Sequence, residues 1–189
     1  MSAFYLKHRL SEDIDLFTYE QEVDQKLVES FLKKVSPELS VKEIKRSQFL
    51  GLVSYKLIYK DNDELKVDFN YYPFLRIDKG TKFKKLEVDS IYDIAANKLH
   101  TLFMKPRERD YVDLYFILKK LKYPLYNLII NTKTKFDWDI DKINLANQFL
   151  RVTDFKEKGL PKVLVPFNSN KMEKFFLDLA KGLEKDIFK

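Results

Sequence analysis

The order of two hydrophobic periodicities constrains the fold of this 189-residue chain most strongly. In the first part of the chain, apolar and polar residues alternate over short runs, which is typical of half-buried β-strands. These runs lie at 13–18, 41–46, 49–59 and 64–69, with a helical spacing only at 19–35. From residue 90 onward the apolar residues follow the spacing of amphipathic helices, at 90–103, 110–121, 141–152 and 171–185. Strands followed by helices predict an α+β domain over residues 1–88 and a helical domain over residues 89–189.

The scarcity of glycine, cysteine and histidine excludes several kinds of site. The four glycines lie too far apart to form a P-loop or a dinucleotide-binding loop. The absence of cysteine excludes disulfides and thiolate zinc sites, and two histidines are too few for a histidine-rich metal site. Any phosphate chemistry must therefore rest on carboxylates, a metal ion and basic side chains.

Charge and hydropathy indicate where the protein works and what it binds. No run of about 18 apolar residues is present, and no secretory signal pattern opens the chain, so we expect a cytoplasmic protein without a membrane partner. The net charge of +6 favours phosphate-bearing partners, although a lysine-rich surface also serves solubility alone.

Two carboxylates stand at alternate positions of the first strand. Asp13 and Asp15 share one face of a strand and lie roughly 7 Å apart, whereas Ile14 and Leu16 take the other face. Such carboxylates can bracket Mg²⁺ or Mn²⁺, which usually arrive with substrate phosphates. The alternative is a strand with one solvated face and no metal.

A third carboxylate, Asp68, stands between the apolar residues Val67 and Phe69, which predicts a central strand. An ionised carboxylate there needs a cation or hydrogen bonds. With Asp13 and Asp15 it would complete the three-carboxylate site that two-metal phosphoryl or nucleotidyl transfer requires. A solvated aspartate on a strand face remains the alternative.

Two charged residues stand out in the helical part. Lys98 lies within the apolar stripe of its helix, so its ammonium group must be paired, reach a phosphate, or extend out to solvent. Asp110 opens the following helix, where capping and the helix dipole favour an aspartate. It is also placed to fix Lys98 or Arg109.

Four ordered landmarks resemble those of the AbiEii/AbiGii toxin family of nucleotidyltransferases. They are the motif from His8 to Phe17 (HRLSEDIDLF), Val67-Asp68-Phe69, the motif from Ile94 to Leu99 (IAANKL), and the motif from Arg109 to Leu114 (RDYVDL). This resemblance implies a core like that of DNA polymerase β, with a mixed or antiparallel sheet and flanking helices, followed by a helical bundle.

The resemblance also implies an activity and partners. It implies Mg²⁺- or Mn²⁺-dependent transfer of a nucleotide from an NTP to a hydroxyl group on RNA, such as tRNA, or on a protein. It further implies a toxin paired with an antitoxin, in abortive infection of phage-infected cells or in plasmid maintenance.

Site residues follow from the same resemblance. Asp13, Asp15 and Asp68 would bind the metal, with Asp68 as third ligand or base. Lys98 would contact the triphosphate or stabilise the transition state, and Asp110 would be a further essential carboxylate. The residues implied to contact substrate are Arg9, Ser11, Lys98, Arg107 and Arg109.

One departure from the family keeps alternatives open. The superfamily carries Gly-Gly or Gly-Ser roughly ten to sixteen residues before the first aspartate, where backbone N–H groups hold the triphosphate. Here only twelve residues precede Asp13 and none is glycine, so the pair is expected upstream of the chain or lost. One alternative is a catalytically impaired protein that binds nucleotide or RNA through Lys98, Lys105, Arg107 and Arg109. Another is a metal-dependent nuclease.

Overall fold

A computed structural model describes residues 2–11, 13–49, 52–104, 106–155 and 159–187. Lys105 lies outside the described residues. The chain forms two compact units, Ser11–Leu75 and a second made of Met1–Leu10 with Arg76–Lys189. The sequence predicts a boundary between residues 88 and 89. The compact units instead group residues 1–10 and 76–88 with the helices. The predicted domain boundary itself stays a prediction.

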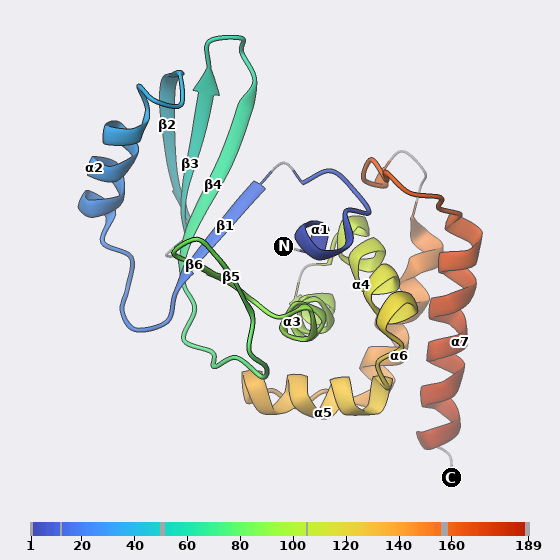
Figure 1. The fold of residues 1–189 in the computed structure, drawn as a ribbon. Coiled ribbons are helices and arrows are strands. Elements are labelled where there is room, and N and C mark those ends of the chain that lie inside the picture. The colour runs from blue at the N-terminus through green and yellow to red at the C-terminus, as the bar shows by residue number, and fades with distance from the viewer. Residues whose placement is uncertain (1, 12, 50–51, 105, 156–158, 188–189) are drawn as a thin grey trace. The chain divides into compact units, whose positions relative to one another are not determined.

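The first unit is built on a four-stranded mixed sheet in the order β1-β4-β3-β2 (Figure 1). Its strands are β1 (Asp13–Thr18), β2 (Val41–Phe49), β3 (Leu52–Tyr59) and β4 (Glu64–Tyr71). β1 runs parallel to β4, and the other two pairs are antiparallel. β4 is a central strand, as the apolar neighbours of Asp68 predict, and the mixed sheet of an α+β fold is confirmed.

One helix, α2 (Gln25–Val35), packs its apolar side on one face of this sheet. Leu32 of this helix is buried together with Val53, Tyr55 and Val67 of the strands. The sequence predicts a helix from residue 19, but α2 begins at Gln25. The Asp24 side chain accepts a hydrogen bond from the Leu27 backbone N–H at 3.0 Å, and this contact caps the first turn of the helix. The opposite face of the sheet carries polar residues of β1, β4 and β3, among them Asp15, Asp68 and Ser54.

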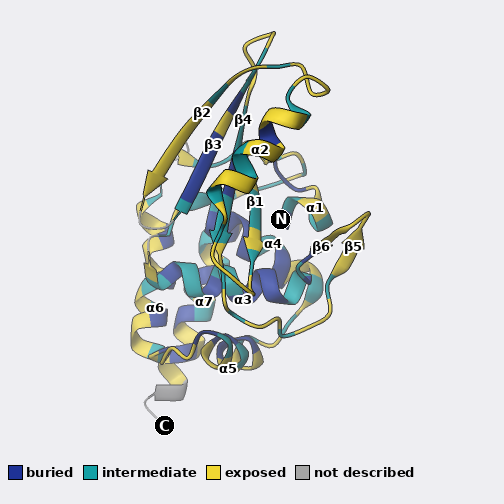
Figure 2. Cartoon of the chain, turned by 90° about the vertical axis from the view of Figure 1, so that its left-hand side faces the viewer, coloured by how far each residue is buried: buried dark blue, intermediate teal, exposed yellow. Residues whose placement is uncertain are grey.

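The second unit is a helical bundle with a single large core. Its helices are α1 (Ser2–Leu6), α3 (Ile91–Met104), α4 (Glu108–Leu121), α5 (Leu125–Phe136), α6 (Lys142–Leu150) and α7 (Ser169–Ile187), with a 3₁₀ turn, η1 (Arg151–Asp154). Figure 2 shows α3 and α4 as the most buried of these helices. Of the helices among the described residues, none is both long and apolar enough to span a bilayer.

Two elements of this unit have no counterpart in the sequence-based expectation. Helix α5 follows Pro124 directly and buries Leu128, Ile129 and Phe136. The polar Thr132 is buried on the same side and interrupts the apolar spacing of this helix in the sequence. A short antiparallel hairpin joins β5 (Thr81–Phe83) to β6 (Leu86–Val88). Its three-residue strands are too short to show a clear alternation.

Candidate functional site

The three predicted metal-binding carboxylates share one face of the sheet. In the parallel pairing of β1 with β4, Asp15 lies directly beside Asp68 and Asp13 directly beside Lys66. Because side chains alternate along a strand, Asp13 and Asp15 project to the same side, opposite the core that α2 covers. The strand thus carries both aspartates on one face, as its alternation predicts, and the register adds the neighbour on β4.

Asp68 is held by two short contacts. Its carboxylate accepts a hydrogen bond from Ser54 Oγ at 2.6 Å and pairs with Lys66 Nζ at 2.5 Å, and the residue is buried. A buried carboxylate in a central strand stays ionised only with such partners. The ammonium of Lys66 shows that the position beside Asp68 accommodates a cation.

A row of three lysines crosses the same face. Lys66 on β4 lies opposite Lys56 on β3, which lies opposite Lys45 on β2, and the row continues from Asp13 on β1. Like charges directly opposite each other on adjacent strands destabilise a sheet. All three lysines reduce this repulsion through ion pairs: Lys66 with Asp68 at 2.5 Å, Lys56 with Glu64 at 2.8 Å and Lys45 with Glu43 at 3.7 Å. An anionic ligand would relieve it further.

The carboxylate face suits a hard divalent cation by its chemistry. Three carboxylates supply the oxygen ligands that Mg²⁺ and Mn²⁺ prefer. Within the described residues no group of three Asp, Glu or His side chains is gathered closely enough to hold a metal ion. Binding would therefore require the side chains of Asp13, Asp15 and Asp68 to converge and Lys66 to release Asp68.

A second cluster of charges lies in the helical unit, where α3 meets α4. Lys98 Nζ on α3 lies 2.6 Å from Asp110 Oδ1 and 2.9 Å from Asp113 Oδ2, both on α4. The lysine is 20% exposed, whereas the two carboxylates are fully buried. Lys98 is thus paired, which is one of the states that its place in an apolar stripe predicts.

Asp113 also binds the segment that precedes β1. Arg9 donates two hydrogen bonds to its carboxylate, from Nε at 2.6 Å and from the second terminal nitrogen at 2.8 Å, and His8 Nε2 lies 2.8 Å away. Burial alone would raise the pKa of Asp113. The hydrogen bonds from Arg9 and His8, with the charge of Lys98, outweigh burial and hold that pKa well below its usual range.

Asp110 begins helix α4. Its carboxylate accepts a hydrogen bond from the Arg107 backbone N–H at 3.1 Å, so it caps the helix as well as pairing with Lys98. Burial acts to raise the pKa of Asp110, but the charge and hydrogen bond of Lys98, followed by Arg107, lower it overall. Both roles that the sequence predicts for this residue, capping and fixing Lys98, are present together.

The residues expected to contact substrate lie in different surroundings. Arg9 is buried against Asp113, and its remaining terminal nitrogen donates to the Leu10 carbonyl at 2.8 Å. Ser11 is exposed and donates weakly to the Asp13 carbonyl at 3.3 Å. Arg107 is 55% exposed and lies 3.3 Å from Asp110. Arg109 also lies on α4, one residue before Asp110.

Sequence reasoning did not include Asp113 and His8 among the site residues. The spacing of Asp113 three residues after Asp110 places both on one side of α4, and this was the available signal. No local pattern marks His8, because its partner is 105 residues away. The sequence patterns also do not predict a further buried ion pair, in which Lys135 lies 2.8 Å from Asp93.

Comparison with known proteins agrees with this geometry. A family model described as nucleotidyl transferase AbiEii toxin, type IV TA (toxin–antitoxin) system, matches residues 1–181. The crystal structure of JHP933 from Helicobacter pylori is similar, with a TM-score of 0.56 and 17% identity, over 98% of this chain and 81% of that one. Comparison with curated protein sequences finds no match. Since the family model spans all but the last eight residues, the chain belongs to the AbiEii family of nucleotidyl transferase toxins of type IV toxin–antitoxin systems.

Proposed function

We propose that this protein is a metal-dependent enzyme that transfers a nucleoside monophosphate from an NTP to a hydroxyl group of an acceptor RNA, such as tRNA, or of an acceptor protein. The observation that carries the proposal is the placement of Asp15 beside Asp68 on paired strands, with Asp13 on the same face. This placement supports a site of hard oxygen ligands for Mg²⁺ or Mn²⁺.

In the proposed reaction the acceptor oxygen attacks the α-phosphorus of the NTP. The new bond joins that oxygen to phosphorus, the bond to the β-phosphate oxygen breaks, and pyrophosphate leaves. Asp13, Asp15 and Asp68 would hold the metal, which when bound supplies positive charge against the triphosphate. Asp68, once released from Lys66, would also accept the proton of the attacking hydroxyl.

Basic side chains in both units support binding of a phosphate-rich substrate. On the sheet, the row Lys66, Lys56 and Lys45 lies beside the carboxylates and would attract the phosphate chain. In the helical unit, Lys98 uses two of its three ammonium hydrogens on Asp110 and Asp113, which leaves the third for a phosphate oxygen. Arg107, Arg109, Ser11 and Arg9 remain proposed substrate contacts.

The proposed partners follow from the family. A toxin of a type IV toxin–antitoxin system acts with an antitoxin, so we expect a cognate antitoxin protein for this chain. NTPs and tRNA are cytoplasmic, and the same compartment is proposed for the protein. An abortive-infection role is a further proposal.

Transfer of radiolabel tests the proposal. Purified protein is incubated with each α-³²P-labelled NTP and Mg²⁺ or Mn²⁺, with tRNA or total cell protein as acceptor. Asp13→Asn and Asp15→Asn should each reduce labelling roughly a hundredfold or more, because each removes charge from the metal site. The matched control is Asp63→Asn, the same change in the exposed turn between β3 and β4.

The outcomes separate the alternatives. Labelling that persists in Asp13→Asn or Asp15→Asn would refute the metal assignment. Cleavage of RNA without NTP would favour a nuclease. Binding of NTP or RNA without any transfer would favour a catalytically impaired binding protein.

A further inference from the structure

The β5–β6 hairpin of the helical unit carries an unusual density of positive charge. Its residues 79–88, here called the basic hairpin, contain four lysines and a single acidic residue, Glu87. The lysines are Lys79, Lys82, Lys84 and Lys85, and all four are exposed.

The carboxylates near the basic hairpin are engaged by other donors. Arg76 pairs with Glu87, and its Nε lies 2.8 Å from Asp89. Asp78 accepts a hydrogen bond from the Lys79 backbone N–H at 2.7 Å. Within the described residues, none of the four lysine ammonium groups of the hairpin has an ion-pair or hydrogen-bond partner. The positive charge of the hairpin is therefore not neutralised from within the protein.

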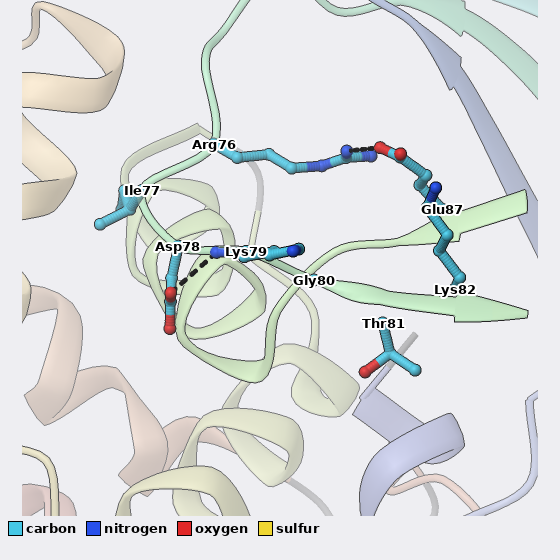
Figure 3. A pocket seen from close by; sticks show the side chains of 8 residues that line it. All are labelled: Arg76, Ile77, Asp78, Lys79, Gly80, Thr81, Lys82 and Glu87. Atoms are coloured by element: carbon cyan, nitrogen blue, oxygen red, sulfur yellow. Dashed lines mark hydrogen bonds and ion pairs between the residues drawn. The ribbon is translucent and has the colours of Figure 1, made fainter.

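A cavity of about 360 Å³ lies at the base of the basic hairpin. Figure 3 shows the side chains of Arg76 and Lys79 extending in the same direction toward the hairpin, where Arg76 meets Glu87. Gly80 forms the tight base of this cavity, because a Cβ atom there would lie 1.9 Å from the Val88 carbonyl oxygen. Three basic residues, Arg76, Lys79 and Lys82, thus line this space together with two acidic ones, Asp78 and Glu87.

Aromatic and apolar side chains are exposed beside the lysines. Phe83 and Leu86 are opposite each other in the hairpin and are 53% and 55% exposed. Phe4 of α1, 46% exposed, meets Phe83 edge to face with ring centroids 6.2 Å apart. Alternating basic and aromatic side chains are typical of surfaces that hold single-stranded nucleic acid, with phosphates on the cations and bases on the rings.

The turn of the hairpin also favours a binding role over a folding role. Lys84 adopts φ 54°, a left-handed conformation that glycine and asparagine adopt at lower cost than lysine. The sequence nevertheless places two consecutive lysines, Lys84 and Lys85, at this tip. Their side chains add charge where a stable turn would need none.

We propose that the basic hairpin and the cavity at its base bind a single-stranded segment of an RNA acceptor. Lys79, Lys82, Lys84 and Lys85 contact its phosphates, and Phe83 stacks on a base. An acidic protein surface would satisfy the lysines but would leave the exposed rings without a function, so RNA is the better match. The inference rests on the proposed function for the identity of the acceptor.

Binding is measured separately from catalysis, so that failure of one is distinguishable from failure of the other. The full chain is titrated, in EDTA and without NTP, into a fluorescently labelled oligoribonucleotide of about 12 nucleotides, and anisotropy is followed at several salt concentrations. The test variant changes Lys79, Lys82, Lys84 and Lys85 to Gln. The matched control changes four exposed lysines on α4 and α7, namely Lys119, Lys120, Lys181 and Lys185, to Gln.

We expect the hairpin variant to bind RNA at least roughly tenfold more weakly. The salt slope, which is the slope of the logarithm of the binding constant against the logarithm of the salt concentration, should decrease in magnitude by up to about 2.8, at about 0.7 for each lost phosphate contact. Phe83→Ala should weaken binding by roughly fivefold or more and leave the salt slope unchanged, because it removes stacking and no charge. The control variant should retain both affinity and slope. Circular dichroism verifies that all variants are folded.

Two results would overturn the proposal. Equal loss of affinity in the hairpin and control variants would mean that only net charge matters. Unchanged RNA binding by the hairpin variant, with loss of binding to labelled poly-L-glutamate, would assign the surface to an acidic protein instead.

Discussion

Substitution of Asp113 by Asn should destabilise the helical unit strongly. The fully buried carboxylate accepts two hydrogen bonds from Arg9 and lies 2.8 Å from His8 Nε2 and 2.9 Å from Lys98 Nζ. Asparagine keeps one oxygen and turns an NH₂ group toward these donors. Lys98 retains Asp110, so the main loss is the charge partner of Arg9, which is only 8% exposed.

The expected magnitude follows from the burial of this pair. Removing one partner of a buried ion pair costs about 3–5 kcal/mol, because the other charge stays in the protein interior. For a chain of this size each kcal/mol lowers Tm by about 2–4 °C, so Asp113→Asn should melt roughly 6–20 °C below the wild type. A loss of this size is a large fraction of the about 5–15 kcal/mol that stabilises a typical domain.

Urea and thermal unfolding measure this loss. The single tryptophan, Trp138, lies in the helical unit, so its fluorescence reports on the unit that contains Asp113. The control is Asp139→Asn, which removes an 80%-exposed carboxylate paired with Lys133 and should cost less than about 1 kcal/mol. If Asp113→Asn melts within about 2 °C of the wild type, Asp113 is not a stabilising centre and the reasoning fails.

Two further predictions concern the same cluster. The pKa values of Asp113 and Asp110 are lowered in the folded protein. Their contribution to the free energy of unfolding is therefore fully present above the pKa of about 4 that they have in the unfolded chain, and it is lost progressively as the pH falls below that value. Urea unfolding between pH 7 and pH 3 should show this loss, and an equally steep loss in Asp113→Asn would contradict it. Lys98→Ala should raise the KM for NTP and lower kcat when assayed well below its melting temperature. Unchanged kinetics with a lowered Tm would assign Lys98 a purely structural role.

Local patterns predicted the individual elements well where their period was clear. β1 has the predicted bounds of Asp13–Thr18, and α4 ends at Leu121 as expected. The start of α2 was predicted too early, because the capping contact of Asp24 decides where the helix begins. Helix α5 and the basic hairpin were missed, since the polar Thr132 interrupts the apolar spacing of the one and the strands of the other are only three residues long.

The sequence by itself determined the order of strands and helices, the faces on which Asp13 and Asp15 lie, and the capping position of Asp110, because each depends on residues a few positions apart. Only the tertiary structure placed Asp15 beside Asp68, aligned three lysines across the sheet and brought Arg9 to Asp113. Strand register and helix packing join residues as far as 105 positions apart, and short-range periodicity carries no information about such partners.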